Sequence, residues 1–120
     1  MIALFQDSPR ARQVAGVAAL FLMAVIATLS LLPSADLPPV EGSDKVKHFV
    51  AYAALGFPVA VWAGPGKALR ALVLTALFGG CVEVAQLLAP TGREGSLLDE
   101  LANVLGGALG TGLALALRKR

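Results

Sequence analysis

Four long apolar runs constrain this sequence more than any other feature. The first, residues 13–32, has no charged side chain and is long enough to cross a bilayer as one helix, which takes about 20 apolar residues. Segments rich in proline or glycine separate the runs, and such residues interrupt helices. We predict helices over residues 13–32, 44–63, 68–89 and 97–117. The predicted fold class is all-α: a polytopic membrane protein with a four-transmembrane-helix bundle, forming one domain over residues 1–120.

The composition agrees with a membrane protein. Hydrophobic residues make up 57% of the chain and charged residues 15%, whereas a soluble domain has about 25% charged residues. A signal peptide is the alternative for the first run, but its apolar core is usually about 7–15 residues, and residues 33–35 make a poor cleavage site. We therefore expect a retained helix. The single cysteine, Cys81, lies in an apolar run and is expected to be a buried, small hydrophobic residue.

Lysine and arginine residues divide unequally between the two sides of the predicted bundle. Seven of the ten lie with the termini and the turn at 64–70: Arg10, Arg12, Lys67, Arg70, Arg118, Lys119 and Arg120. The other side carries Lys45, Lys47 and Arg93. Because basic loops remain in the cytoplasm, we predict cytoplasmic termini and outward-facing connections near residues 33–47 and 90–98.

Polar residues gather near the outer ends of three predicted helices. They are Asp44, Lys45, His48, Tyr52, Glu83, Gln86, Arg93, Asp99 and Asn103. Residues spaced by four, such as 44, 48 and 52, share one helix face. Glu83 stands seven residues before Pro90, which is about 10 Å inside the helix end at about 1.5 Å per residue. A carboxylate at that depth needs a partner or must be protonated. We therefore predict that these side chains converge in an outward-facing polar pocket.

Small residues form a stripe on the predicted fourth helix. Asn103, Gly106 or Gly107, and Gly110 share one face, and residues 106–110 match the GxxxG pattern that lets helices approach closely in lipid. We expect this stripe to pack onto the second and third helices. The Gly106/Gly110 face is also a candidate for contact with another copy of the chain or a membrane partner. Matching small residues occur in the other two helices: Gly56, Gly79 and Gly80.

The polar residues resemble the sequence pattern of VanZ-like membrane proteins. The resemblance covers residues 43–117 and rests on three blocks in the same order: Asp44-Lys45-x-x-His48-x-x-x-Tyr52-x-x-Leu55-Gly56, then Glu83-x-x-Gln86 with Pro90-x-Gly92-Arg93, and Asp99-x-x-x-Asn103-x-x-Gly106. It implies a small multi-helix protein of the bacterial inner membrane. The family takes its name from a member linked to reduced sensitivity to the glycopeptide antibiotic teicoplanin. An aromatic residue common in the family before the aspartate is replaced here by residues 95–98, so a ligand contact from it is not expected.

Four functions remain open for the pocket. It could bind or modify an envelope molecule with an anionic or sugar headgroup, held by Lys45, His48 and Arg93. It could be a transferase or hydrolase acting on a lipid phosphate, with His48, Glu83 and Asp99 as candidate catalytic residues. It could hold a metal through His48 with Glu83, Asp44 or Asp99, but one histidine with carboxylates is a weak ligand set, and no tight HxxxH or CxxC spacing is present. Finally, Glu83–Arg93 and Lys45–Asp99 pairs could simply staple the helices together.

Of these four functions, we favour the binding pocket and leave open whether a reaction is catalysed. The expected partners are membrane lipid and a lipid-linked envelope precursor, with altered glycopeptide sensitivity as one outcome. We predict no nucleic-acid partner, and the small net charge of +2 gives no information on this point. We predict no cofactor and no metal, because the sequence has neither a phosphate-cradling glycine loop nor a tight ligand motif.

Overall fold

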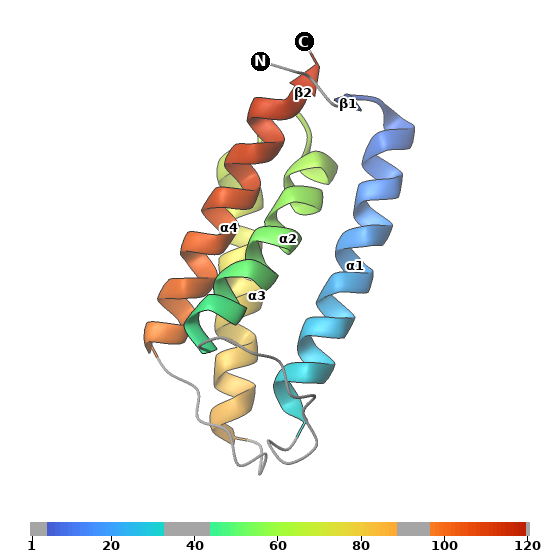
Figure 1. Cartoon of the computed structure of the whole chain (residues 1–120). Coiled ribbons are helices and arrows are strands. Elements are labelled where there is room, and N and C mark those ends of the chain that lie inside the picture. Colours follow the sequence, from blue (N-terminus) through green and yellow to red (C-terminus); the bar gives the residue numbers. More distant parts are fainter. Residues whose placement is uncertain (1–4, 33–43, 89–96, 120) are drawn as a thin grey trace.

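The protein is a bundle of four long helices, as predicted (Figure 1). The computed structural model describes residues 5–32, 44–88 and 97–119. The helices are α1 (Pro9–Leu31), α2 (Asp44–Ala63), α3 (Ala68–Leu88) and α4 (Leu97–Leu117). All four are long and apolar enough to span a membrane. Their 20 to 23 residues correspond to about 30–35 Å at about 1.5 Å per residue, close to the thickness of a bilayer core.

Helix α1 begins four residues earlier than the predicted residue 13. The Ser8 side chain accepts a hydrogen bond of 3.0 Å from the Ala11 backbone N–H, which caps the helix. Pro9 follows in the first turn, where its missing N–H is no disadvantage. The prediction was based on hydrophobicity and therefore missed a polar first turn. The other three helices begin at the predicted residues, and the predicted end of the third, residue 89, lies outside the described residues.

The two ends of the chain meet at one end of the bundle (Figure 1). Two short strands, β1 (Phe5–Gln6) and β2 (Arg118–Lys119), pair in parallel there. Beside them, Arg12 donates two hydrogen bonds to the Asp7 carboxylate, at 3.0 and 2.8 Å. These bonds favour the ionised acid and lower the pKa of Asp7. We call this the terminal end of the bundle, and the opposite end the loop end.

Helices α2 and α4 are packed at backbone distance, as the glycine stripe predicts. A Cβ atom at Gly106 would overlap the carbonyl oxygen of Phe49, and one at Gly110 would overlap that of Ala53. Only glycine leaves room for the neighbouring backbone at these two positions. The stripe is therefore used inside the bundle, and contact of this face with another copy of the chain or a membrane partner remains a prediction.

A third glycine of α4 faces both α2 and α3. A Cβ at Gly107 would lie 3.0 Å from Thr75 Cγ2, and a Cβ at Gly56 would lie 2.6 Å from the Gly107 carbonyl oxygen. Thr75 is itself buried and donates a 2.8 Å hydrogen bond to the Ala71 carbonyl of its own helix. Helix α4 thus holds α2 and α3 together, as expected.

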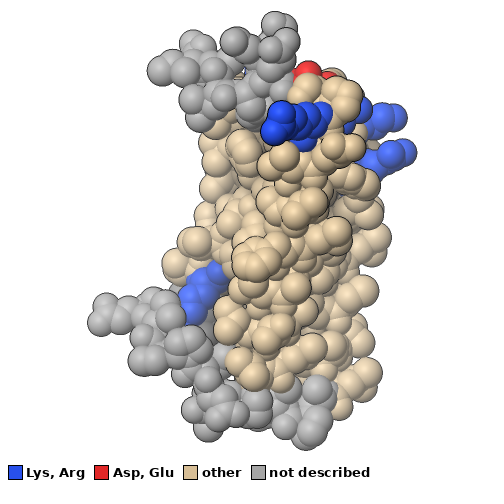
Figure 2. Space-filling model, turned by 90° about the vertical axis from the view of Figure 1, so that its right-hand side faces the viewer, with Lys and Arg blue, Asp and Glu red and all other residues tan. Residues whose placement is uncertain are grey.

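The outer surface suits a lipid environment. Large aliphatic side chains of all four helices point outward, including Val17, Val50, Leu77 and Leu105. On the face shown in Figure 2, lysine and arginine gather at the terminal end, and a broad tan band without charge lies below them. A second blue group lies near the loop end of this face. The arrangement is that of a multi-pass membrane protein.

Candidate functional site

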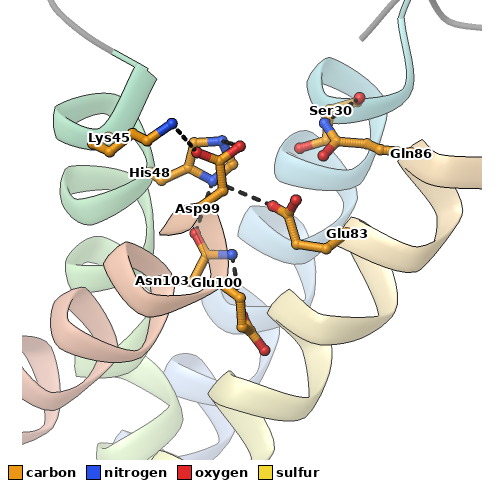
Figure 3. A network of polar contacts seen from close by, with 8 residues as sticks. All are labelled: Ser30, Lys45, His48, Glu83, Gln86, Asp99, Glu100 and Asn103. Atoms are coloured by element: carbon orange, nitrogen blue, oxygen red, sulfur yellow. Dashed lines mark hydrogen bonds and ion pairs between the residues drawn. The ribbon is translucent and has the colours of Figure 1, made fainter. Parts of the chain in front are cut away.

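The predicted polar residues that the structure describes come together near the loop end. Helix α2 contributes residues from its first turns, α3 from its last turns and α4 from its first turns (Figure 3). We call these seven side chains the polar cluster: Lys45, His48, Tyr52, Glu83, Gln86, Asp99 and Asn103. All but Lys45 are buried.

His48 lies at the centre of the polar cluster (Figure 3). Its Nδ1 lies 2.8 Å from Asn103 Oδ1 and 3.7 Å from Glu83 Oε1. Its Nε2 lies 3.7 Å from Asp99 Oδ2. The side chains of His48, Glu83 and Asp99 are only 10%, 7% and 9% exposed. The fold therefore buries an imidazole between carboxylates from two other helices.

Asn103 determines which nitrogen of His48 carries the hydrogen. Its Nδ2 donates a 3.3 Å hydrogen bond to Glu100 Oε1, so its carbonyl oxygen faces His48. Because a carbonyl oxygen can only accept, Nδ1 of His48 is the donor. In the neutral imidazole the lone pair is then on Nε2, which faces Asp99. The chain from Glu100 through Asn103 thus orients His48.

Glu100 was not among the predicted site residues. It fits against α3 where that helix has two consecutive glycines: a Cβ at Gly79 would lie 2.7 Å from Glu100 Oε1, and a Cβ at Gly80 would lie 2.9 Å from Oε2. Two signals in the sequence could have revealed it. Glu100 precedes Asn103 by three residues on one helix face, and adjacent glycines indicate a close approach in the facing helix.

Lys45 and Asp99 form the predicted ion pair, with 2.9 Å between Lys45 Nζ and Asp99 Oδ1. The lysine side chain is 51% exposed, so its ammonium group remains at the edge of the bundle while its partner is buried. The pair therefore places a positive charge at the exposed edge of the polar cluster.

Gln86 connects the polar cluster to α1. Its Nε2 donates a 2.8 Å hydrogen bond to the backbone carbonyl of Ser30. Ser30 was not among the predicted site residues, because a backbone acceptor cannot be recognised from side-chain type. Gln86 is 2% exposed, and its side-chain oxygen has no hydrogen-bond partner among the described residues.

Tyr52 lies one turn beyond His48 and is 2% exposed. Its ring packs against Phe78, with 6.2 Å between the ring centroids. It also lies beside Asn103, since both side chains approach the same side of Gly79. Its hydroxyl has no hydrogen-bond partner within the described part of the chain. Tyr52 is therefore inside the bundle and carries a polar group that nothing described satisfies.

Two predicted site residues cannot be placed, and one other prediction is wrong. Arg93 and the side chain of Asp44 lie outside what the structure describes, so the predicted Glu83–Arg93 pair remains a prediction. Cys81, expected to be buried, is exposed on α3. Cys81 faces outward from the bundle, so its apolar sequence neighbours indicate a small residue that faces the membrane rather than the core.

The polar cluster can hold a polar ligand, transfer a proton or bind a cation. Its carboxylates accept hydrogen bonds, Lys45 supplies a positive charge, and His48 can both donate and accept. Burial strengthens each of these interactions because water competes less for the groups.

Comparison with known proteins gives one family. The model of the VanZ/LLP1 family matches residues 12–118, nearly the whole chain and the entire polar cluster. No curated protein and no solved structure matches the chain. The family match agrees with the resemblance seen in the three sequence blocks and with the four membrane-spanning helices. The chain is therefore a membrane protein of the VanZ/LLP1 family.

Proposed function

We propose that the polar cluster binds the headgroup of a cell-envelope lipid or of a lipid-linked envelope precursor. The observation that carries this proposal is the pair of buried, unsatisfied polar groups: the Tyr52 hydroxyl and the Gln86 side-chain oxygen. A buried polar group without a partner costs about 1–3 kcal/mol. A headgroup that donates to Gln86 and bonds Tyr52 would remove this cost.

The chemistry of the polar cluster matches a headgroup that combines hydroxyl or amide groups with phosphate. Glu83 and Asp99 can accept hydrogen bonds from sugar hydroxyls, and Tyr52 can donate or accept one. Lys45 stands at the exposed edge, where it can pair with a phosphate. Arg93, which the sequence also places at this site and whose side chain suits bidentate contact, would be a second phosphate ligand. Altered sensitivity to teicoplanin would then follow if the bound precursor is the target of the antibiotic.

Two alternatives use the same contacts. The Lys45–Asp99 pair and the Gln86–Ser30 bond join different helices, which favours a purely structural network. The placement of His48 between two carboxylates favours a transferase or hydrolase acting on a lipid phosphate, with His48 as the general base. Both alternatives predict the same fold, so they are distinguished by the ligand that the purified protein retains.

We further propose that the loop end faces outward across the bacterial inner membrane and that both termini are cytoplasmic. Support comes from the basic residues at the terminal end: Arg10, Arg12, Lys67, Arg70 and Arg118. The loop end has Lys45 and Lys47 among its described residues. Positive charge favours the cytoplasmic side. An outward-facing polar cluster would meet envelope precursors after they cross the membrane.

Single cysteines test the proposed orientation. In a Cys81→Ser background, Lys47→Cys should react with a membrane-impermeant maleimide added to intact spheroplasts, whereas Lys67→Cys should react only after permeabilisation. Lys47 is chosen because replacing Lys45 would break its ion pair with Asp99. Labelling of residue 67 from outside, with residue 47 protected, would reverse the orientation.

Native mass spectrometry tests the proposed ligand. Protein purified in mild detergent should retain an envelope lipid, for example a polyprenyl phosphate or a lipid-linked sugar, at a level above bulk phospholipid. His48→Gln removes the ring that contacts Asn103, Glu83 and Asp99. We expect this variant to retain at least tenfold less of that lipid, the change that about 1.4 kcal/mol of lost binding produces.

Asp7→Asn is the matched control for lipid retention. It also alters an ionisable side chain, but at the terminal end, where Asp7 contacts Arg12. It should retain lipid like the wild type. Bulk phospholipid alone on all three proteins, at equal folded yield, would contradict the proposed function.

A further inference from the structure

His48, Glu83 and Asp99 bring three potential metal ligands together from three helices. One ring nitrogen of the histidine and one oxygen of each carboxylate all lie within 4.8 Å of one another, and all three residues are buried. The sequence predicts no metal site, because these residues stand far apart in the chain. In the folded protein, helix packing brings the three residues together, so close spacing in the sequence is not required.

The distances are near those of a coordinated ion. Ligand atoms at about 2.0–2.2 Å from a tetrahedral zinc ion are roughly 3.4 Å apart. Asp99 Oδ2 lies 3.7 Å from Nε2, the nitrogen with the lone pair, whereas Glu83 Oε1 lies 3.7 Å from Nδ1. The three ligand atoms start within 4.8 Å of one another, so a rotation of the Glu83 side chain toward Nε2 is the change that coordination requires.

The residues around His48 are arranged as in a metal site. Metal-bound histidines commonly donate their second ring N–H to a carbonyl or carboxylate, which fixes the orientation of the ring. Here Nδ1–H donates to Asn103, and Asn103 is held in turn by Glu100. This leaves the lone pair of Nε2 on the side of Asp99, a carboxylate whose Oδ2 faces it.

A second observation concerns the side-chain hydroxyl of Tyr52. The hydroxyl is buried and has no hydrogen-bond partner in the described part of the protein, and the Tyr52 ring lies beside Asn103, which contacts His48. A water molecule bound to an ion at this position would provide that partner. Three protein ligands plus a water molecule is the coordination pattern of catalytic zinc sites.

We infer that His48, Glu83 and Asp99 bind a divalent transition-metal ion, with Asn103 and Glu100 as the residues that position the imidazole. An imidazole with two carboxylates suits zinc or manganese, since imidazole favours zinc and carboxylates favour manganese. Two carboxylates balance a divalent ion, and the Lys45 ammonium that contacts Asp99 Oδ1 adds one positive charge at the exposed edge of the cluster. This inference does not depend on the proposed lipid ligand.

The test measures metal bound per chain. Tag-free protein in a Cys81→Ser background avoids binding to a histidine tag or to the exposed thiol. The protein is equilibrated with ZnCl₂ or MnCl₂, passed through gel filtration, and analysed by elemental mass spectrometry and by thermal unfolding. We expect about one ion per chain, removal by chelator, and an unfolding temperature that rises with metal concentration.

Four variants and one control locate the ion. His48→Gln, Glu83→Gln and Asp99→Asn each remove a ligand and should each weaken binding more than about 100-fold. Asn103→Ser removes the support of the imidazole and should weaken binding by about 10–100-fold, the usual effect of residues behind the ligands. Asp7→Asn, at the terminal end, should bind like the wild type.

Two results would overturn the inference. One is wild-type protein that holds fewer than about one ion per ten chains after equilibration at concentrations that saturate typical zinc sites. The other is equal occupancy in wild type and in folded His48→Gln and Asp99→Asn, which would place the ion elsewhere. If one of the three ligand variants does not fold, the metal occupancy of the other two tests the inference. Metal bound without retained envelope lipid would contradict the proposed function alone, and the reverse result would contradict only this inference.

Discussion

Gly106→Leu or Gly110→Leu should prevent the protein from folding into a stable bundle. Each glycine faces a backbone carbonyl of α2, of Phe49 and Ala53 respectively, at a distance that leaves no room for even a Cβ atom. A flexible side chain could turn away, but these carbonyls belong to a helix. Overpacking a tight core usually costs about 1–3 kcal/mol. We expect a loss of stability at the upper end of this range or above it, because α4 also packs against α3.

Gly112→Leu is the matched control for this stripe. Gly112 belongs to the same helix, and a Cβ there would meet nothing within 4 Å. The variant should have the same yield of monodisperse protein in detergent as the wild type and nearly the same unfolding temperature, both measurable by fluorescence-detected gel filtration. If Gly106→Leu behaves like Gly112→Leu, then α2 and α4 do not pack as described.

Asn103→Leu should lower stability strongly, although it keeps the number and branching of the side-chain heavy atoms. Asn103 is fully buried and bonds both His48 and Glu100. Leucine would leave both of these groups without that partner, and each unsatisfied buried group costs about 1–3 kcal/mol. Thermal unfolding in detergent measures the effect.

Thr111→Val provides the control for losing a buried polar group. Thr111 is 5% exposed, and its hydroxyl has no hydrogen-bond partner among the described residues. Valine has the same shape and removes an unsatisfied hydroxyl, so stability should stay the same or rise. Equal losses in Asn103→Leu and Thr111→Val would mean that the bonds of Asn103 contribute little.

The fold was predictable from the sequence because membrane helices follow from local composition. Each apolar run of about 20 residues must form a helix to satisfy its backbone in lipid, and prolines and glycines separate the runs. What local composition could not reveal is the start of α1, which depends on the Ser8 cap, and the pairing of Phe5–Gln6 with Arg118–Lys119. That pairing joins segments from opposite ends of the chain and has no hydrophobic pattern.

The sequence could predict which polar side chains of the described helices lie near one another, but not which contacts they make. Helix spacing places His48 and Tyr52 on one face, and depth in the membrane identifies Glu83. The pairing partners depend on helix rotation, which is fixed by the glycine contacts of α4 rather than by the polar residues themselves. This is why the Lys45–Asp99 pair was one of several possibilities and why the role of Glu100 was missed.

The most direct test of the central claim compares stability and ligand binding in one variant. Glu83→Gln with Asp99→Asn removes both carboxylates that flank His48 while keeping their shapes. Buried charges that serve a ligand often reduce stability, whereas charges that staple helices add to it. The two outcomes can be measured in the same preparation, by native mass spectrometry and by thermal unfolding after the lipid is stripped.

A headgroup site predicts that the stripped double variant unfolds within about 4 °C of the stripped wild type, a difference of roughly 1 kcal/mol or less, or at a higher temperature. The same variant should have lost the envelope lipid that the wild type retains. A variant that unfolds far below the wild type, when the wild type itself carries only bulk phospholipid, would contradict the claim and identify the polar cluster as a structural network.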